Sequence, residues 1–165
     1  MAKAPVLPPQ ASLLDRLLDD EPQHTREPPP SAAQALRALR QGVRRDLEHL
    51  LNARRRPGPL PAGLQELEHS LLRYGLPDFA TFNLASAEGR EAFRRLIEDT
   101  LKRCEPRFRQ VRVQLLDNAE PLDRTLRFRI DALLNVEPAP EPIAFDSVLE
   151  PVSGGFALRG EGRDQ

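Results

Sequence analysis

The chain has 165 residues and a mass of 18.6 kDa, which suits one domain with a hydrophobic core and is too small for two ordinary domains. Charged residues make up 30% and hydrophobic residues 39%, a balance that excludes a chain disordered throughout. The net charge of −1 gives no overall signal for binding polyanions and leaves only local basic patches to consider.

Residues 1–30 are predicted to form a flexible, proline-rich arm. Seven of the 17 prolines lie there, and proline removes an amide donor and disfavours helix interiors. Residues 12–18 are the exception, because Ser12 can cap a helical turn with a leucine-rich face. Such a short segment is not stable alone. It either packs on its own domain or docks in a partner groove, and Leu14 and Leu17 are the candidate contacts.

A single folded domain is expected over residues 31–160, with residues 161–165 as a tail. Its first element is an amphipathic helix over residues 31–53, because apolar side chains recur there at steps of three and four. These side chains are Leu36, Leu39, Val43, Leu47 and Leu50. A shorter leucine-bearing helix is predicted to follow and to end in a glycine-stopped turn at residues 74–79.

A second strong helix is predicted over residues 87–104, with Ser86 as its N-cap. After Pro106 the hydrophobic period changes from helical to alternating. This change predicts two strands, at residues 111–115 and at residues 126–132.

The loop between these strands, residues 117–123, has the length and the turn residues of a hairpin. Two weaker strands are predicted at residues 143–149 and 156–159. Helices first and a small, largely antiparallel sheet last predict an α+β fold.

The sequence carries no recognisable catalytic, phosphate-binding or metal-binding motif. Glu66 and His69 have the E-x-x-H spacing of carboxylate-bridged metal sites, but such sites need two copies and further glutamates. His24 lies in the arm, and Cys104 lies on an apolar helix face, where an inert buried thiol is expected. We therefore expect no enzymatic activity, no cofactor and no metal.

Arginines on the outer face of the first long helix are the strongest signal for nucleic acid, and Arg44 and Arg45 are among them. Only two of the 24 basic residues are lysines, a bias that a GC-rich genome explains. Readers of single strands interleave aromatic residues with cations, and this helix has none, while Asp46 and Glu48 reduce its charge. A solvated or protein-facing arginine face is favoured, and nucleic-acid binding is the weaker alternative.

The compartment is predicted from what the chain lacks. One cysteine cannot form an internal disulfide, so nothing indicates an oxidising compartment. The first ten residues contain one lysine and no apolar core, so we expect no secretory signal. No stretch approaches the roughly 18 apolar residues that span a bilayer. These features predict a cytoplasmic protein.

Four short sequences, followed by V-x-V-x-L and L-x-F-x-I strands, together resemble one family. They are LLDRL at residues 13–17, VRRDLEHLLNARR at 43–55, SLLRYGLPDF at 70–79 and CEPRF at 104–108. In this order they resemble TssE, the family of type VI secretion baseplate subunits. That family is related to the wedge protein that initiates the sheath of contractile phage tails. The resemblance covers roughly residues 12–150.

The resemblance implies a structural subunit that lies in the baseplate wedge with TssF, TssG and TssK. It also implies that this subunit offers the first template for the sheath proteins TssB and TssC. Such a baseplate assembles at the inner face of the inner membrane, so the subunit meets the membrane only through the secretion complex. The family has also been labelled lysozyme-like, so peptidoglycan hydrolysis is the alternative function, although no acid and nucleophile pair stands out.

Glu105, Pro106 and Arg107 match the E-P-R signature of the family, which is associated with contacts in the wedge core. Pro106 disfavours helical geometry at Glu105, so the helix is expected to end there and the strand to begin at a set angle. Glu105 and Arg107 could then pair with each other or with charges of a partner. A purely structural corner is the alternative.

The predicted strand with Leu126, Phe128 and Ile130 could expose an edge that accepts a strand from another chain. Main-chain hydrogen bonds would supply affinity, and the alternating side chains would fix the register. The alternative is that the strands simply close their own sheet.

Overall fold

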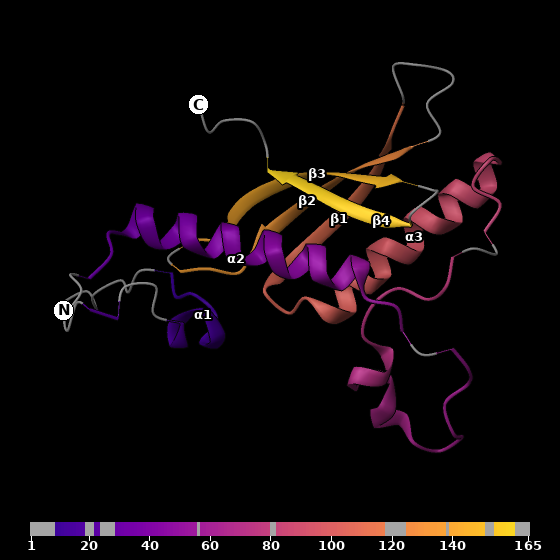
Figure 1. Cartoon of the computed structure of the whole chain (residues 1–165), viewed down its shortest axis with the longest axis horizontal. Helices are drawn as coiled ribbons and strands as arrows, with labels where there is room; N and C mark the ends of the chain where they lie inside the picture. Colours follow the sequence, from indigo (N-terminus) through magenta and orange to yellow (C-terminus); the bar gives the residue numbers. More distant parts are fainter. Residues whose placement is uncertain are drawn as a thin grey trace.

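The computed structural model describes residues 9–18, 22–23, 29–55, 57–79, 82–117, 125–137, 139–150 and 154–160. Its helices are α1 (Leu13–Leu17), α2 (Ala32–Asn52) and α3 (Ala87–Cys104), with two 3-10 turns, η1 (Gln65–His69) and η2 (Leu71–Arg73). Its strands are β1 (Phe108–Leu116), β2 (Leu126–Leu134), β3 (Glu141–Glu150) and β4 (Gly155–Gly160). Helices precede an antiparallel sheet (Figure 1), which confirms the predicted α+β fold.

The two long helices begin at their capping residues. Ser31 Oγ accepts a hydrogen bond from Gln34 N at 3.3 Å, and Gln34 Oε1 accepts one from Ser31 N at 2.9 Å, which forms a capping box. Ser86 Oγ accepts a bond from Gly89 N at 3.0 Å. Both helices therefore lie within one residue of their predicted bounds.

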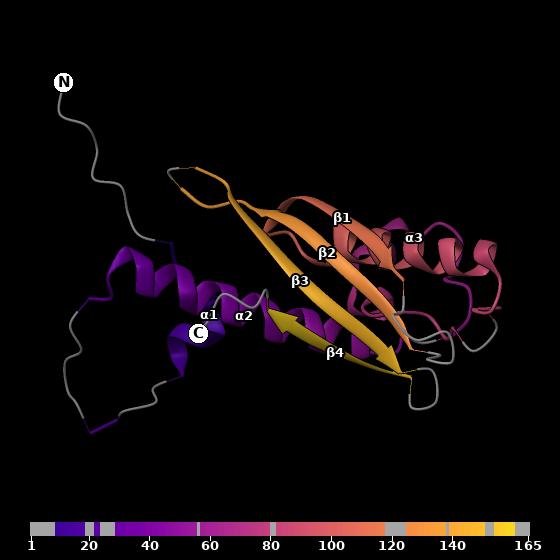
Figure 2. The same cartoon turned by 90° about the horizontal axis from the view of Figure 1, so that it is seen from above.

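The four strands form one antiparallel sheet in the order β1-β2-β3-β4 (Figure 2). Side chains alternate between its faces, so Phe128 and Ile130 are buried on the inner face. The outer face carries charged side chains, among them Arg129 and Asp146. One face is therefore made for packing and the other for solvent or a partner.

Helices α2 and α3 both pack on the inner face, α2 near β4 and α3 near β1 (Figures 1 and 2). A phenylalanine cluster joins these layers, since the Phe93 ring of α3 lies 5.9 Å from the Phe128 ring and 6.4 Å from the Phe156 ring. Near the other end of α2, Arg40 Nη2 lies 2.6 Å from Glu141 Oε1 at the start of β3. The core thus spans both helices and all four strands.

The short helix predicted after α2 forms as two 3-10 helices. This segment forms η1 and η2. Leu64, Leu71 and Leu72 are exposed, with the Leu71 side chain 88% exposed, while Leu67 is half-buried. The leucines have helical spacing, but Ser70 between η1 and η2 has an extended backbone, with φ −87° and ψ 171°, which interrupts the segment. Gly75 ends it, as predicted, with a φ of +87° and with Ala53 O only 2.4 Å from where a Cβ would lie. Leu76 N can then donate to Ala53 O at 3.0 Å.

Three predictions fall wholly or mainly outside the described residues. They concern the arm, the hairpin loop and the tail, where residues 1–8, 19–21, 24–28, 118–124 and 161–165 are not described. The division into an arm of residues 1–30 and a domain of residues 31–160 therefore stays a prediction. In the part of the chain that the structure describes, no helix is both long and apolar enough to cross a bilayer.

Candidate functional site

The E-P-R corner lies where α3 ends and β1 begins. Glu105 N donates to Leu101 O at 3.0 Å, and Pro106 then turns the chain toward the strand. The buried Glu105 carboxylate accepts three hydrogen bonds from Arg107: from its backbone N at 3.1 Å, from Nε at 2.7 Å and from Nη2 at 2.5 Å. These bonds raise the pKa of the Arg107 guanidinium above its ordinary value. The two charges of the corner therefore pair with each other.

A chain of ion pairs leads from this corner to α1. Arg107 Nη2 lies 2.9 Å from Asp46 Oδ2, and Arg45 Nη2 lies 3.0 Å from Asp46 Oδ1. Arg45 Nη2 also lies 2.7 Å from Asp15 Oδ1. The pKa of the Asp15 carboxyl is lowered, mainly by a hydrogen bond from the Ser12 hydroxyl and next by a hydrogen bond from Arg45. Together with Glu105, this series of ion pairs contains three carboxylates and two guanidinium groups, so its net charge is −1.

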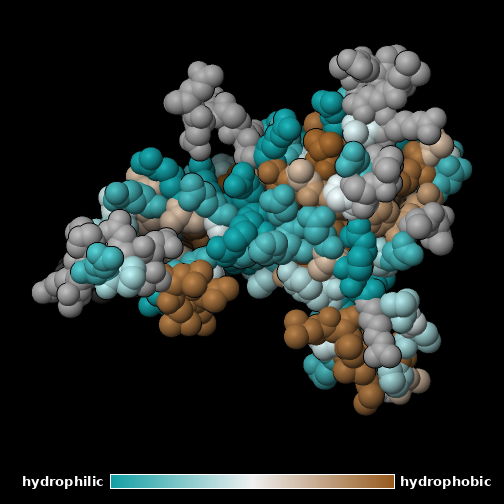
Figure 3. Space-filling model, in the orientation of Figure 1, coloured by the Kyte–Doolittle hydropathy of each residue, from teal (hydrophilic) through white to brown (hydrophobic). Residues whose placement is uncertain are grey.

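Helix α1 rests on α2 through its polar side. Asp15 Oδ2 would lie 2.9 Å from a Cβ at Gly42, so the glycine in the middle of α2 leaves room for this carboxylate. The leucines of α1 point away from the domain, with Leu14 62% and Leu17 81% exposed. They form the hydrophobic patch over α1 in Figure 3. Two roles are predicted for this segment: packing on its own domain and docking in a partner groove. Its polar side packs on the domain, and its leucine side is exposed.

A second apolar projection lies on the other side of the corner. Leu64, Leu71 and Leu72 of the η1 and η2 region are exposed, and they form the second hydrophobic patch at the lower edge of Figure 3. Arg103 Nη2 donates to Arg73 O at 3.3 Å, which holds this projection against the end of α3. The E-P-R corner is therefore flanked by two leucine-bearing projections, which we call the α1 and η patches.

The strand predicted to accept a partner does not lie at an edge. β2 lies between two strands, and it pairs with β1 from Arg127 to Leu134 and with β3 from Leu126 to Leu134. Phe128 and Ile130 are buried in the core, and Leu126 packs against it. The predicted edge role of Leu126, Phe128 and Ile130 is therefore wrong, because their main-chain groups are already paired within the sheet. The edges of the sheet are β1 and β4.

The β1 edge is covered in its middle by charged side chains of α3. Val113 N donates to Glu98 Oε2 at 3.2 Å, and Arg94 Nη1 donates to Val113 O at 3.0 Å. Glu98 also pairs with Arg94 and Lys102, each at 2.6 Å. Burial opposes ionisation of Glu98, but bonds from Lys102, Val113 N and Arg94 outweigh it and lower its pKa to about 2.

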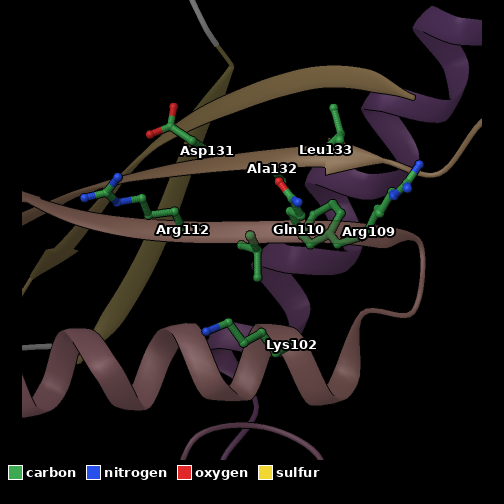
Figure 4. A pocket seen from close by; sticks show the side chains of 9 residues that line it. Lys102, Arg109, Gln110, Arg112, Asp131, Ala132 and Leu133 are labelled. Atoms are coloured by element: carbon green, nitrogen blue, oxygen red, sulfur yellow. The ribbon is translucent and has the colours of Figure 1, made fainter. Parts of the chain in front are cut away.

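An open hollow of about 610 Å³ lies beside the first half of β1 (Figure 4). Lys102 of α3 borders it on one side, and Arg109 and Arg112 of β1 and Asp131 of β2 border it on the other. The hollow contains no residue of the E-P-R corner. Three of the four charged side chains that line it are cations, and apolar residues such as Phe108 and Leu133 complete the lining.

Near its start, the β4 edge is covered by one neutral side chain of α2. Asn52 Nδ2 donates to Phe156 O at 2.9 Å, and Phe156 N donates to Asn52 Oδ1 at 2.9 Å. The amide of Asn52, the last residue of α2, thus makes the two bonds that a neighbouring strand residue would make.

The sequence reasoning missed most of the polar residues that organise these sites. Asn52, Arg94 and Glu98 have long-range partners that no local pattern indicates. In the sequence Asp46 only weakens a basic patch, whereas in the fold it joins α2 to the corner. Gly42 carried a usable signal, because a glycine inside a helix is costly unless something approaches it closely.

Comparison with known proteins identifies the family of the chain. The family model of baseplate wedge protein gp25 matches residues 37–139, from within α2 to the residues before β3, and this range includes the E-P-R corner. A comparison with curated proteins found no match. The matched range covers more than half of the chain. The chain therefore belongs to the gp25 family of baseplate wedge proteins, whose role in the baseplate is structural.

Proposed function

We propose that the chain is the TssE-type subunit of a type VI secretion baseplate, which docks in the wedge and templates polymerisation of the contractile sheath. One observation carries the proposal: a gp25-family chain has a four-stranded sheet, backed by helices, whose outer strands still carry main-chain groups without a described partner. Such edges accept strands from other chains. The proposed function is assembly, and no covalent bond is made or broken.

Docking in the wedge is assigned to the end of the molecule that holds the E-P-R corner. Glu105 and Arg107 are bound to each other, so the corner offers a rigid, preformed surface rather than free charges. The α1 patch, with Leu14 and Leu17, and the η patch supply apolar area on both sides of it. We assign this end to contacts with TssF, TssG and TssK, in the cytoplasm at the inner face of the inner membrane.

Sheath templating is assigned to the sheet. A strand from TssB or TssC would extend the sheet by one member, and its main-chain bonds would supply affinity without a demanding sequence. The helices packed on the inner face hold the template rigid before the first sheath subunit arrives.

Affinity capture of the tagged chain from its native bacterium, followed by mass spectrometry, tests the proposal. Recovery of TssK, TssF, TssG or sheath proteins supports it. Recovery of none of them overturns it. Two further assays address the alternatives: lysis of purified peptidoglycan, abolished by a single carboxylate change, would indicate a hydrolase. Salt-sensitive binding of nucleic acid, weakened by Arg44→Ala and Arg45→Ala, would indicate a nucleic-acid module.

A further inference from the structure

The two caps show which main-chain groups of the edge strands point outward. Phe156 uses its N–H and C=O on Asn52, so these groups face away from β3. Because outward groups recur at every second residue, Leu158 and Gly160 also present theirs outward. Val113 is capped in the same way, so the next outward groups of β1 lie at Val111 and Leu115.

The β1 edge is poorly suited to a long added strand. Its cap lies between the two open positions, so a strand would be interrupted at Val113 or would have to displace Glu98. Glu98 is held there by ion pairs with Arg94 and Lys102. A neutral main chain would replace charge-assisted hydrogen bonds, which are the stronger kind. The incoming strand would gain little from this exchange.

The β4 edge offers a continuous run. Its cap lies at one end, and no described residue bonds the outward groups of Leu158 or Gly160. Asn52 is exposed and neutral, so an incoming strand can extend the run by taking its place at Phe156. Beyond β4, the edge of β3 is blunted, because Pro142 has no N–H to offer there.

The outer face adds a charge preference. Arg129, Asp146 and Arg159 follow one another across β2, β3 and β4 in the register of the sheet. Arg129 Nη1 lies 3.9 Å from Asp146 Oδ1, so the signs alternate along this row. A carboxylate on the next strand, opposite Arg159, would continue the alternation.

We infer that β4 is the strand-accepting edge, that Asn52 keeps the place of the incoming strand at Phe156, and that the triad of Arg94, Glu98 and Lys102 closes β1. The partner segment is an extended strand with an acidic residue opposite Arg159. This inference rests on the proposed templating function and names the edge on which templating occurs.

Amide hydrogen exchange of the full chain, alone and with the purified TssB–TssC sheath complex, tests the inference. In the chain alone, the amides of Leu158 and Gly160 should exchange faster than those of Val113 and Phe156. With the sheath complex, Leu158 and Gly160 should slow by on the order of a hundredfold, while Val111 and Leu115 stay unchanged. Protection gained at Val111 and Leu115 instead would overturn the choice of edge and leave templating intact. Absence of any binding would overturn templating, and the inference with it.

A matched pair of charge reversals supplies the second test. Arg159 of β4 lies opposite Asp146, and Arg112 of β1 lies opposite Asp131, so Arg159→Glu and Arg112→Glu carry similar costs inside the sheet. Arg159→Glu should weaken binding of the sheath complex roughly tenfold, because it places a like charge opposite the partner's carboxylate. Arg112→Glu should leave binding unchanged. The reverse order of effects would contradict the inference.

Discussion

Arg107 shows how much of this molecule depends on single polar side chains. Its guanidinium fixes the turn from α3 into β1, neutralises the buried carboxylate of Glu105 and reaches Asp46 on α2. A planar guanidinium with several donors can make these contacts together, and a lysine cannot. The E-P-R residues therefore have a direct physical use in the fold, beside the docking role proposed for them.

Removal of this guanidinium should destabilise the domain. Arg107→Ala leaves the Glu105 carboxylate buried without a counter-charge, so we expect the free energy of unfolding to fall by about 3 kcal/mol, the lower end of the range for broken buried pairs. Urea denaturation followed by circular dichroism measures this change. Adding Glu105→Gln to the same chain removes the unpaired charge and should restore part of the loss. An unchanged denaturation midpoint in Arg107→Ala would contradict the pairing.

Substitution of Gly75 should also lower the free energy of unfolding, for a conformational reason. Gly75→Ala combines a positive φ with a Cβ 2.4 Å from Ala53 O, so we expect a loss of more than about 2 kcal/mol in unfolding free energy. Gly63 is the matched control, because its φ of +88° is similar but nothing lies within 4 Å of its Cβ. Gly63→Ala should cost about 1 kcal/mol. Equal losses in the two variants would show that the close approach at Ala53 contributes nothing.

At the scale of elements, the long helices were predictable and the connections between distant elements were not. Ser31, Ser86 and the apolar period lie within a few residues of what they determine, so α2 and α3 were predicted within one residue. The interior place of β2 depends on β3, which lies later in the chain, and no property of β2 alone reveals it. Asn52 and Phe156 are likewise far apart in sequence, so the edge cap could not be read before the fold was known.

The pairing of α3 with β1 should depend on pH in a definite direction. The pKa of Glu98 falls from 4.5 to about 2 in the folded chain, so its ionised form favours folding. This contribution is complete above about pH 4.5 and is lost as the pH falls toward about 2. Unfolding free energies measured across this window should fall more steeply for the native chain than for Glu98→Gln. Parallel pH profiles of the two proteins would contradict the assignment.

Gly42 makes room for α1 on α2, and it should do so at the cost of lower stability of α2. Gly42→Ala removes the glycine penalty in a helix interior, about 1 kcal/mol, but its Cβ would lie 2.9 Å from Asp15 Oδ2. The variant should therefore melt at a higher temperature while α1 is held less tightly. Trypsin cleavage after the exposed Arg16 reports on α1 and should become faster. Slower or unchanged cleavage would show that Asp15 does not need the space above Gly42.

At the scale of the whole molecule, the core lies within the predicted domain. Every residue of the core cluster falls between Leu39 and Leu158, and no part of α1 belongs to it. A domain boundary near residue 31 stays a prediction, made because proline density falls and helical periodicity begins there. The position of α1 was not predictable, because it depends on ion pairs that only the folded arrangement brings together.

Deletion of residues 1–30 should therefore leave the domain folded. The truncation removes the pair between Asp15 and Arg45, which is partly exposed and worth at most about 1 kcal/mol. We expect the melting temperature to change by less than about 5 °C, as measured by circular dichroism. A chain that no longer melts cooperatively would show that the arm is part of the folding unit.

Helix α2 connects the E-P-R corner to β4 and so fixes the orientation of one relative to the other. Its 21 residues form a rod about 31 Å long. Along this rod Arg40 holds the start of β3, Arg45 and Asp46 hold α1 and the corner, and Asn52 holds β4. A rigid rod transmits orientation as well as position. In the proposed assembly, the angle at which the corner is fastened therefore sets the direction in which the edge of β4 points, and with it the tilt of any strand added to that edge.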